Sequence, residues 1–248
     1  VRGKALYTKM DFLFKMIGEI LNSSKLEDTK RLYEIVASVK SRAQVKLTGA
    51  GHSTAVLRAA AYSSPMAAFQ DEMAGIGYYQ FIEKLEKDFE QRKEETVEEL
   101  CKLMKKILRP ENFMISYTGE RESLETVQKL AGAVKAGLGT EPVEKSEEKL
   151  TCTKKNEGFK TSGQVQYVAQ TGNFKKKGLE YTGALEILKV ILSYDYLWQN
   201  VRVKGGAYGC MSSFNRIGEG YLVSYRDPNL EKTMEIYEGV VDYLKNFN

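Results

Sequence analysis

The chain has one histidine and three cysteines among its 248 residues. A zinc enzyme needs several nitrogen, sulfur or carboxylate ligands that converge on one point, so His52 alone cannot build a zinc centre. We therefore expect this chain by itself to bind no metal. Cys101, Cys152 and Cys210 are odd in number and widely spaced, with no pair at zinc-ligand or redox spacing. This usage favours reduced thiols in a cytosolic or similarly reducing compartment.

Long apolar runs and a strong charge of one sign are also missing. No stretch approaches the roughly 18 apolar residues that a transmembrane helix needs, so we expect no membrane span. The net charge of +4 comes from interspersed acidic and basic residues, whereas nucleic-acid binding requires a clustered basic face. We expect neither nucleic acid nor membrane as a partner.

The N-terminus resembles neither a translation start nor a targeting sequence. Val1-Arg2-Gly3 has no initiator methionine and does not begin a signal peptide. We expect an internal or C-terminal piece of a longer polypeptide. The compartment stays open, with the cytoplasm or an organelle matrix favoured over secretion.

The first 110 residues have helical periodicity. A second amphipathic helix is predicted at about 28–46, and a long charged helix ends at Leu108 with a break near Arg92. Gly49-Ala50-Gly51 follows no strand and has no third glycine, so we interpret it as a helix–helix connection rather than a phosphate-binding loop. Arg109-Pro110 ends the helical part. The first helix has one apolar stripe, formed by Leu6, Met10, Leu13, Ile17 and Leu21.

After Pro110 the pattern changes to alternation, which predicts strands. The order β-α-β-α-β-β-α predicts an α+β fold in which a two-layer sandwich has one sheet with helices against one face. The domains expected are a mostly helical segment, 1–110, and a sandwich, 111–248. The predicted strands are 113–118, 164–170, 207–214 and 220–226. The predicted helices are 124–138, 181–201 (buried on most of its circumference) and a last one capped by Asp227-Pro228.

The candidate site lies where the helix of residues 181–201 gives way to the hairpin. Arg202 and Tyr208 are two hydrogen-bond donors on either side of the Gly205-Gly206 bend. Glycine permits a sharp turn and close approach of a ligand backbone. Such donors could bind a substrate carbonyl and hold its oxygen more strongly as negative charge develops. An alternative stays open, in which Arg202 interacts with a helix dipole and Tyr208 is an ordinary strand aromatic.

Four other features have plainer interpretations. His52 is expected to have a structural role in a glycine-containing turn. Cys210 follows Tyr208 by two positions, which predicts the same sheet face, and it is expected to be a buried small apolar residue rather than a nucleophile. Lys175-Lys176-Lys177 is expected to be a solvated turn. Trp198 is expected to pack the helix end.

Several stretches resemble a known family. Leu197 to Gly209 (LWQNVRVKGGAYG) and Ser224 to Leu230 (SYRDPNL) are similar to the C-terminal half of the pitrilysin/insulinase superfamily, within the presequence-protease branch of those zinc metallopeptidases. Gly51-His52-Ser53, residues 75–79 and residues 112–119 are also similar to that branch. In the family, four related α+β domains form two half-shells around a peptide-sized chamber. The resemblance implies that this chain is the end of the third domain and the whole fourth domain.

The resemblance also implies roles for individual residues. The family's arginine and tyrosine that reach the substrate at the zinc fall on Arg202 and Tyr208, and the bend of Gly205 and Gly206 would face the bound peptide. The inverted zinc motif His-x-x-Glu-His belongs to the family's first domain and is absent here. The metal would therefore belong to the full-length enzyme.

We therefore hypothesise a C-terminal fragment of a zinc-dependent metalloendopeptidase that degrades short unfolded peptides. Its partners would be the zinc-bearing N-terminal half and peptide substrates, and the isolated chain would be inactive. One alternative is a non-catalytic binding or assembly subunit of the same superfamily. A third possibility is a free-standing interaction module.

Overall fold

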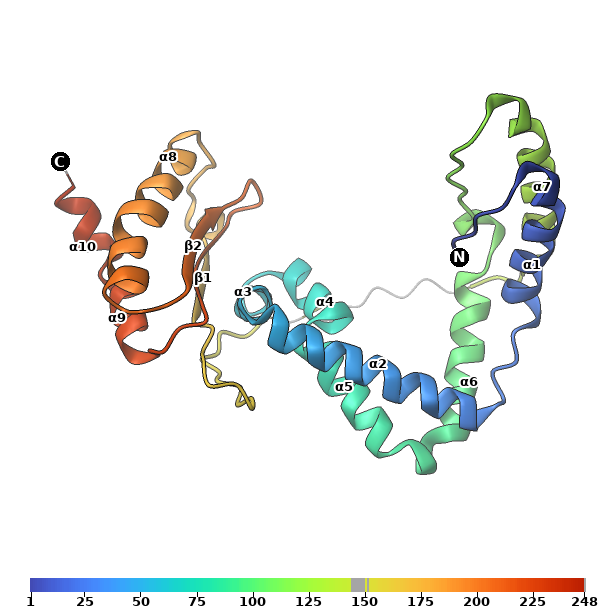
Figure 1. The fold of residues 1–248 in the computed structure, drawn as a ribbon, viewed down its shortest axis with the longest axis horizontal. Coiled ribbons are helices and arrows are strands. Elements are labelled where there is room, and N and C mark those ends of the chain that lie inside the picture. Colours follow the sequence, from blue (N-terminus) through green and yellow to red (C-terminus); the bar gives the residue numbers. More distant parts are fainter. Residues whose placement is uncertain (144–149, 151, 248) are drawn as a thin grey trace. The chain divides into compact units, whose positions relative to one another are not determined.

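The computed structural model describes residues 1–143, 150 and 152–247. Its contacts divide the chain into two compact units, the first comprising Val1–Val36 with Leu85–Glu147 and the second Ala37–Lys84 with Glu148–Asn248. Two helices, α2 (Thr29–Gly49) and α5 (Ile76–Lys87), contribute residues to both units (Figure 1). Within the described residues, no helix is long and apolar enough to cross a membrane.

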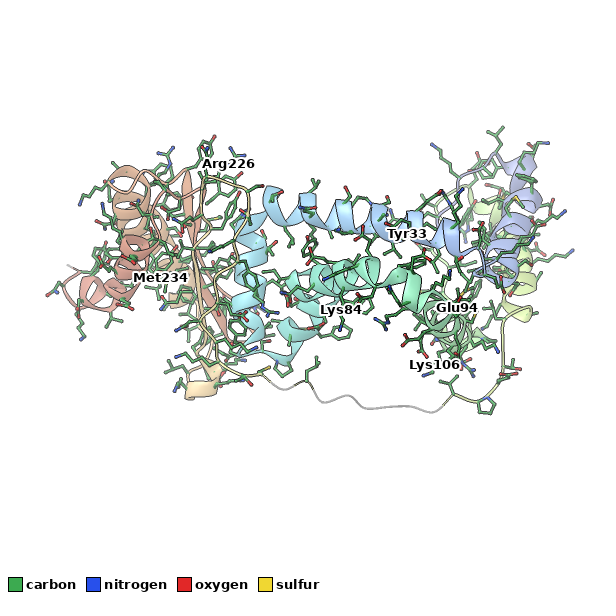
Figure 2. All side chains as sticks on the ribbon, turned by 90° about the horizontal axis from the view of Figure 1, so that it is seen from below. Tyr33, Lys84, Glu94, Lys106, Arg226 and Met234 are labelled. Carbon is green, nitrogen blue, oxygen red and sulfur yellow. The ribbon has the colours of Figure 1, made fainter. Side chains whose placement is uncertain are left out.

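The first unit is built from helices. Of the apolar stripe predicted for the first helix, Met10, Ile17 and Leu21 pack in or against the cluster that faces α7 (Leu124–Ala136), whereas Leu6 precedes α1 (Met10–Ser23) and is exposed. Met10, Phe14, Val127 and Val134 form the buried cluster between α1 and α7. Tyr33, labelled in Figure 2, packs its ring 5.4 Å from that of Phe89. The remaining elements are η1 (Tyr7–Lys9), α1 (Met10–Ser23), α6 (Phe89–Ile107), η2 (Pro110–Asn112), η3 (Arg121–Ser123) and α7 (Leu124–Ala136).

Two predictions for this unit are wrong. Residues 113–118 form no strand; Phe113 and Tyr117 instead pack against the α1–α7 cluster. Alternating apolar and polar residues indicate that one side of a segment is buried. Here α1 and α7 bury that side, and no partner strand is needed. The long charged helix breaks at Asp88, between α5 and α6, rather than near Arg92. It does end before Pro110, as predicted.

The second unit contains a three-stranded antiparallel sheet, which confirms the α+β class. Its strands are β1 (Ala169–Asn173), β2 (Gly209–Phe214) and β3 (Glu219–Tyr225), in the order β1-β3-β2. The hairpin between β2 and β3 turns at Gly218, which has φ of +96°. Cys210 pairs with Ser224 and Met211 pairs with Val223, so these two pairs point to opposite faces of the sheet.

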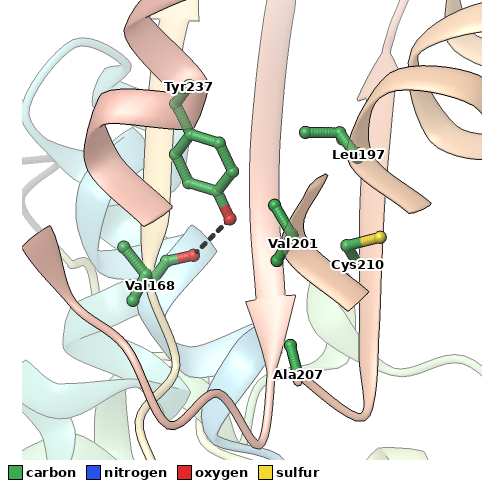
Figure 3. Close-up of a cluster of buried hydrophobic side chains, with 6 residues drawn as sticks. All are labelled: Val168, Leu197, Val201, Ala207, Cys210 and Tyr237. Atoms are coloured by element: carbon green, nitrogen blue, oxygen red, sulfur yellow. Dashed lines mark hydrogen bonds between the residues drawn. The ribbon is translucent and has the colours of Figure 1, made fainter. Parts of the chain in front are cut away.

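Helices cover the face of the sheet to which Cys210 points. α8 (Ala184–Val190) continues into a wide-turned helix, η5 (Ile191–Val203), and α9 (Glu231–Glu238) and α10 (Val240–Lys245) follow the sheet. Figure 3 shows the buried cluster on this face, which contains Val168, Leu197, Val201, Ala207, Cys210 and Tyr237. The Tyr237 hydroxyl donates to the carbonyl of Val168 at 3.1 Å, and burial raises the pKa of this phenol.

The opposite face of the sheet meets α3 (Gly51–Ala61), which contacts β1 and β3 and packs against α4 (Pro65–Ala74). The connection between α2 and α3 is the helix–helix link that Gly49-Ala50-Gly51 predicted. Gly51 lies so close to the ring of Tyr167 that a Cβ there would stand 2.3 Å from it. The Tyr167 hydroxyl donates to the carbonyl of Thr48 at 3.0 Å, which ties the end of α2 to the segment before β1.

Three further expectations need correction. In the early part of the strand predicted at 164–170, Gln166 makes an isolated bridge to Asp227, the carbonyl of Val168 accepts from the amide of Ser224, and β1 begins at Ala169. The last helix begins at Glu231, so Asp227 and Pro228 belong to the loop that precedes it. The helix predicted at 181–201 is exposed along one side, where Ile187, Val190, Tyr194 and Trp198 are exposed.

The domain boundary expected near Pro110 stays a prediction. It lies inside the first unit, whose second segment runs to Glu147. The turn at Lys175-Lys176-Lys177 is exposed, as predicted, and forms the short helix η4.

Candidate functional site

The bend predicted at Gly205-Gly206 joins the end of η5 to β2. The amide of Lys204 donates to the carbonyl of Gln199 at 3.0 Å, an i to i−5 bond that marks the wide turns of this helix. Gly206 has φ of +82°, and a Cβ on Gly205 would stand 2.4 Å from the carbonyl oxygen of Val201. Glycine is therefore required at both positions: at Gly206 for the left-handed backbone, and at Gly205 for the close approach.

Arg202 is half-buried at the end of η5 and is held in two ways. Its Nε donates to the backbone carbonyl of Tyr208 at 3.1 Å, and its guanidinium carbon stands 4.2 Å from the ring centroid of Trp198. This stacking is a cation–π contact. Its two terminal nitrogens have no hydrogen-bond acceptor in the part of the chain that the structure describes. The arginine is thus positioned by the protein while it keeps donors for a ligand.

Tyr208 is the exposed member of the pair. Its side chain is 69% exposed, and its ring packs edge-on against Tyr225 at 5.9 Å between centroids. Within the described residues its hydroxyl has no hydrogen-bond partner. Its backbone amide donates to the carbonyls of Tyr225 and Arg226 at 3.0 and 3.2 Å, which fixes the entry to β2.

The alternation of residues predicted that Tyr208 and Cys210 share a sheet face, and this prediction is wrong. Tyr225, which the Tyr208 ring meets, is paired with Gly209, whereas Cys210 is paired with Ser224. Tyr208 precedes the first residue of β2, so the alternation of the strand does not extend to it. Cys210 itself is buried, as expected, and burial raises its pKa to about 11 even though Arg202 lowers it. A thiol that stays protonated is a poor nucleophile.

The loop that contains Asp227 and Asn229 braces the bend, a role that the sequence did not predict. The side-chain amide of Asn229 donates to the carbonyl of Gly205 at 2.6 Å. The buried carboxylate of Asp227 accepts hydrogen bonds from the backbone amide of Asn229 at 2.9 Å and from the Thr233 hydroxyl at 2.8 Å. Arg226, labelled in Figure 2, reverses the chain with a φ of +49°. The sequence signals were the resemblance of the SYRDPNL stretch and the helix cap predicted at Asp227-Pro228, and neither predicted that this loop braces the bend.

An aromatic group surrounds Tyr225 beyond the bend. His52, the second residue of α3, meets the Tyr225 ring edge-on at 4.9 Å, and the ring of Tyr167 lies 5.7 Å from it. His52 therefore packs in a cluster of rings close to a glycine turn. In the described residues, no three histidine, cysteine, aspartate or glutamate side chains are grouped to hold a metal ion. What the geometry offers is a pair of donors beside an open bend.

Comparison with known families assigns a class to this arrangement. Residues 1–85 match the model described as Peptidase M16C associated, and residues 156–248 match the model described as PreP C-terminal domain. The second match includes the bend, its donors and the bracing loop. The chain belongs to the M16C peptidases of the presequence-protease group, as a C-terminal portion.

Individual relatives agree with this class. Protein HypA of Clostridium perfringens is 38% identical over 98% of this chain. Presequence protease 1, chloroplastic/mitochondrial, of Arabidopsis thaliana is 30% identical over the whole chain, and the mitochondrial presequence protease of Yarrowia lipolytica is 28% identical over 94% of it. The chain spans only 25%, 23% and 24% of these three relatives, respectively.

Proposed function

We propose that this chain is the C-terminal portion of a zinc-dependent metalloendopeptidase that cleaves short unfolded peptides. The observation that carries the proposal is the pair of uncommitted donors on Arg202 and Tyr208 beside a bend that only glycine can form. The family matches support it, because the second match covers the whole bend. The names of two relatives, presequence proteases of mitochondria or chloroplasts, make peptides the substrate class to test.

In this proposal the bend receives the substrate backbone. Gly205 and Gly206 let an extended peptide approach the chain closely, and the terminal nitrogens of Arg202 and the hydroxyl of Tyr208 donate to a peptide carbonyl. Donors held in advance bind an oxygen more strongly as its negative charge grows during hydrolysis. Trp198 and Asn229 would keep the arginine and the bend in place. The sheet and its helices would form part of the chamber wall.

The metal belongs to another part of the enzyme. The chain has one histidine, and its described residues offer no ligand group that fits zinc. Zinc, when bound in the full enzyme, would activate the water that attacks the peptide bond. The proposed partner is accordingly the N-terminal half that carries the His-x-x-Glu-His motif. The proposed compartment is an organelle matrix or the cytoplasm, and the relatives' names make mitochondria and chloroplasts the first to examine.

The test is a comparison of Arg202→Ala and Tyr208→Phe with the unchanged sequence in the intact peptidase. Loss of one donor to a developing oxyanion costs about 100- to 1,000-fold in kcat, so we expect a rate loss of that order for Arg202→Ala, with bound zinc unchanged by metal analysis. Trp198→Leu serves as a packing control with a smaller loss. Unchanged kinetics of both donor variants would remove them from the reaction.

A second measurement separates the peptidase from a non-catalytic subunit. The isolated 248-residue chain should hydrolyse no fluorogenic peptide and bind no stoichiometric zinc. Zinc-dependent turnover by this chain alone would contradict the proposed division of roles. If the polypeptide that precedes it carried no His-x-x-Glu-His motif, a binding or assembly role would replace the peptidase.

A further inference from the structure

A cavity of about 320 Å³ lies on the sheet face opposite η5, within the second unit. α3 and α4 form one wall and the β1–β3–β2 sheet forms the other. Ligand sites of small molecules begin at about 300 Å³, so the cavity can take one long side chain or a small amine. Its apolar lining includes Val56, Leu57, Ala60, Met211 and Val223.

Two residues of the lining carry buried polar atoms that have no hydrogen-bond partner among the described residues: Nδ1 of His52 and Oε1 of Glu219. The other carboxylate oxygen of Glu219 accepts from the side-chain amide of Asn215 at 3.0 Å, so half of this carboxylate is satisfied and half is not. A buried acceptor without a donor is unfavourable. Both side chains would gain by turning towards a donor that enters the cavity.

The chemistry of the missing donor follows from charge. Among the described lining residues, Glu219 is the only aspartate, glutamate, lysine or arginine, so a formal negative charge faces an otherwise neutral cavity. A neutral imidazole protonated on Nε2 also presents Nδ1 as an acceptor. The anionic acceptor of Glu219, the first residue of β3, favours a group with N–H donors and a positive charge. Nδ1 of His52 is a separate acceptor, near Tyr225 at the other end of that strand. The apolar walls favour an aliphatic stem on that group.

We propose that this cavity binds an aliphatic cation, that is, an ammonium or guanidinium group on a short apolar stem. Such a group could be the side chain of lysine or arginine in a peptide, or a free alkylamine. The site is distinct from the Arg202–Tyr208 pair, which is cationic and prefers the opposite charge. It does not depend on the proposed peptidase function, because its test is binding to this chain alone.

The test uses the single histidine of the chain as a reporter. The imidazole NMR signals of His52 can be assigned without ambiguity, since no other histidine is present. The probes are Nα-acetyl-lysine methylamide, Nα-acetyl-arginine methylamide, n-butylamine and the uncharged Nα-acetyl-norleucine methylamide. We expect the cations to shift the His52 signals in a saturable way, and the norleucine compound to bind at least about tenfold more weakly, the ratio expected for one charge-assisted hydrogen bond.

Glu219→Gln should abolish the preference for the cations, and Glu231→Gln, an exposed change on α9, should leave it intact. Stronger binding of the blocked amino acids than of butylamine would identify a peptide side chain as the ligand, and the reverse would identify a free amine. Two results would overturn the proposal. One is equal binding of the norleucine compound, and the other is no His52 shift with any cation at about 10 mM, a concentration about 100 times a Kd of about 0.1 mM. The probe series on the unchanged chain decides this even if Glu219→Gln folds poorly.

Discussion

The second unit contains two arrangements of arginine, tyrosine and paired glycines that satisfy their donors differently. In the first, Nη1 of Arg58 donates to buried Asp71 at 2.7 Å and its Nε donates to Glu157 at 2.9 Å. The Tyr62 hydroxyl donates to Glu157 as well. In the second, the one hydrogen bond that Arg202 makes to the described residues is from its Nε to the backbone carbonyl of Tyr208.

The glycines differ in the same way. Asp71, 1% exposed, accepts from the amides of Ile76 and Gly77 at 2.9 and 3.1 Å, so the turn at Gly75 is closed around a carboxylate that caps α5. At the Gly205-Gly206 turn, by contrast, the side-chain amide of Asn229 donates to the carbonyl of Gly205, and among the described residues no carboxylate accepts from the amides of the turn. The first arrangement uses its polar groups to hold the fold, whereas in the second the terminal nitrogens of Arg202 and the hydroxyl of Tyr208 have no partner among the described residues, as the proposed ligand site requires. Similar residues therefore have separate roles, and the difference lies in whether an acidic partner is present.

The largest expected effect comes from the arginines. Arg58→Ala would leave Asp71 buried without its cation, which costs about 3–5 kcal/mol of unfolding free energy. Burial by itself lowers the pKa of Arg58, but its hydrogen bonds to Glu157 and Asp71 outweigh this and the pKa is raised, so the arginine is charged at every working pH. Urea unfolding of the isolated chain measures the loss.

Arg202→Ala is the matched control for this measurement. It removes one hydrogen bond and one ring contact at a half-exposed position, and we expect a loss below about 1 kcal/mol. If both variants lost the same stability, the distinction between a structural arginine and a ligand-binding arginine would fail.

The tyrosines give a second, smaller contrast. Tyr62→Phe removes a hydroxyl that is bonded to the charged groups of Arg58 and Glu157, and hydrogen bonds to charged groups are worth about 1.5–3 kcal/mol. Tyr208→Phe removes a hydroxyl with no partner in the described chain, so its cost should stay within about 0.5 kcal/mol. The same unfolding experiment checks both. A large loss for Tyr208→Phe would reveal a structural role for its hydroxyl and weaken the proposed site.

This contrast marks the limit of what sequence reasoning could predict. The Arg202–Tyr208 bend and the hairpin were predictable, because glycine pairs and period-two alternation are local signals. The partners of Arg58 were not, since Asp71 and Glu157 lie 13 and 99 residues from it along the chain, and only the fold brings the three together. The strand expected at 113–118 failed for a related reason: alternation shows that Phe113 and Tyr117 are buried on one side, but not that a strand lies beside them.

The glycines of the bend should respond unequally to substitution. Gly205→Ala forces a Cβ to within 2.4 Å of the Val201 carbonyl oxygen, and the backbone must shift, which we expect to cost about 1–3 kcal/mol. At Gly206 the nearest atom is the Cγ of Pro228 at 3.6 Å, so Gly206→Ala pays only for its left-handed backbone, about 1 kcal/mol. Thermal unfolding of the two variants compares them. A larger loss of stability for Gly206→Ala than for Gly205→Ala would mean that the backbone angle at Gly206, not the close approach at Gly205, is the main reason the bend needs glycine.

The smallest expected effect on stability tests whether the bend must be braced to serve a ligand. Asn229→Ala removes the hydrogen bond to the Gly205 carbonyl, which is worth about 0.5–1.5 kcal/mol. Because Asn229 lies on the loop and is not one of the donors, it is a positioning residue, and its loss should loosen Arg202 and Tyr208 without removing either.

In the intact peptidase we therefore expect Asn229→Ala to lower kcat while the zinc content is unchanged. Asn229→Asp keeps the side-chain shape but cannot donate when ionised, so we expect it to lower kcat as well. The matched control is Asn246→Ala, at the residue that follows α10. Among the described residues, the side-chain amide of Asn246 donates to the carbonyl of Asp242 alone. Equal kcat values for the Asn229 and Asn246 variants would show that the bend keeps its shape unaided, and would leave Asn229 with a structural role alone.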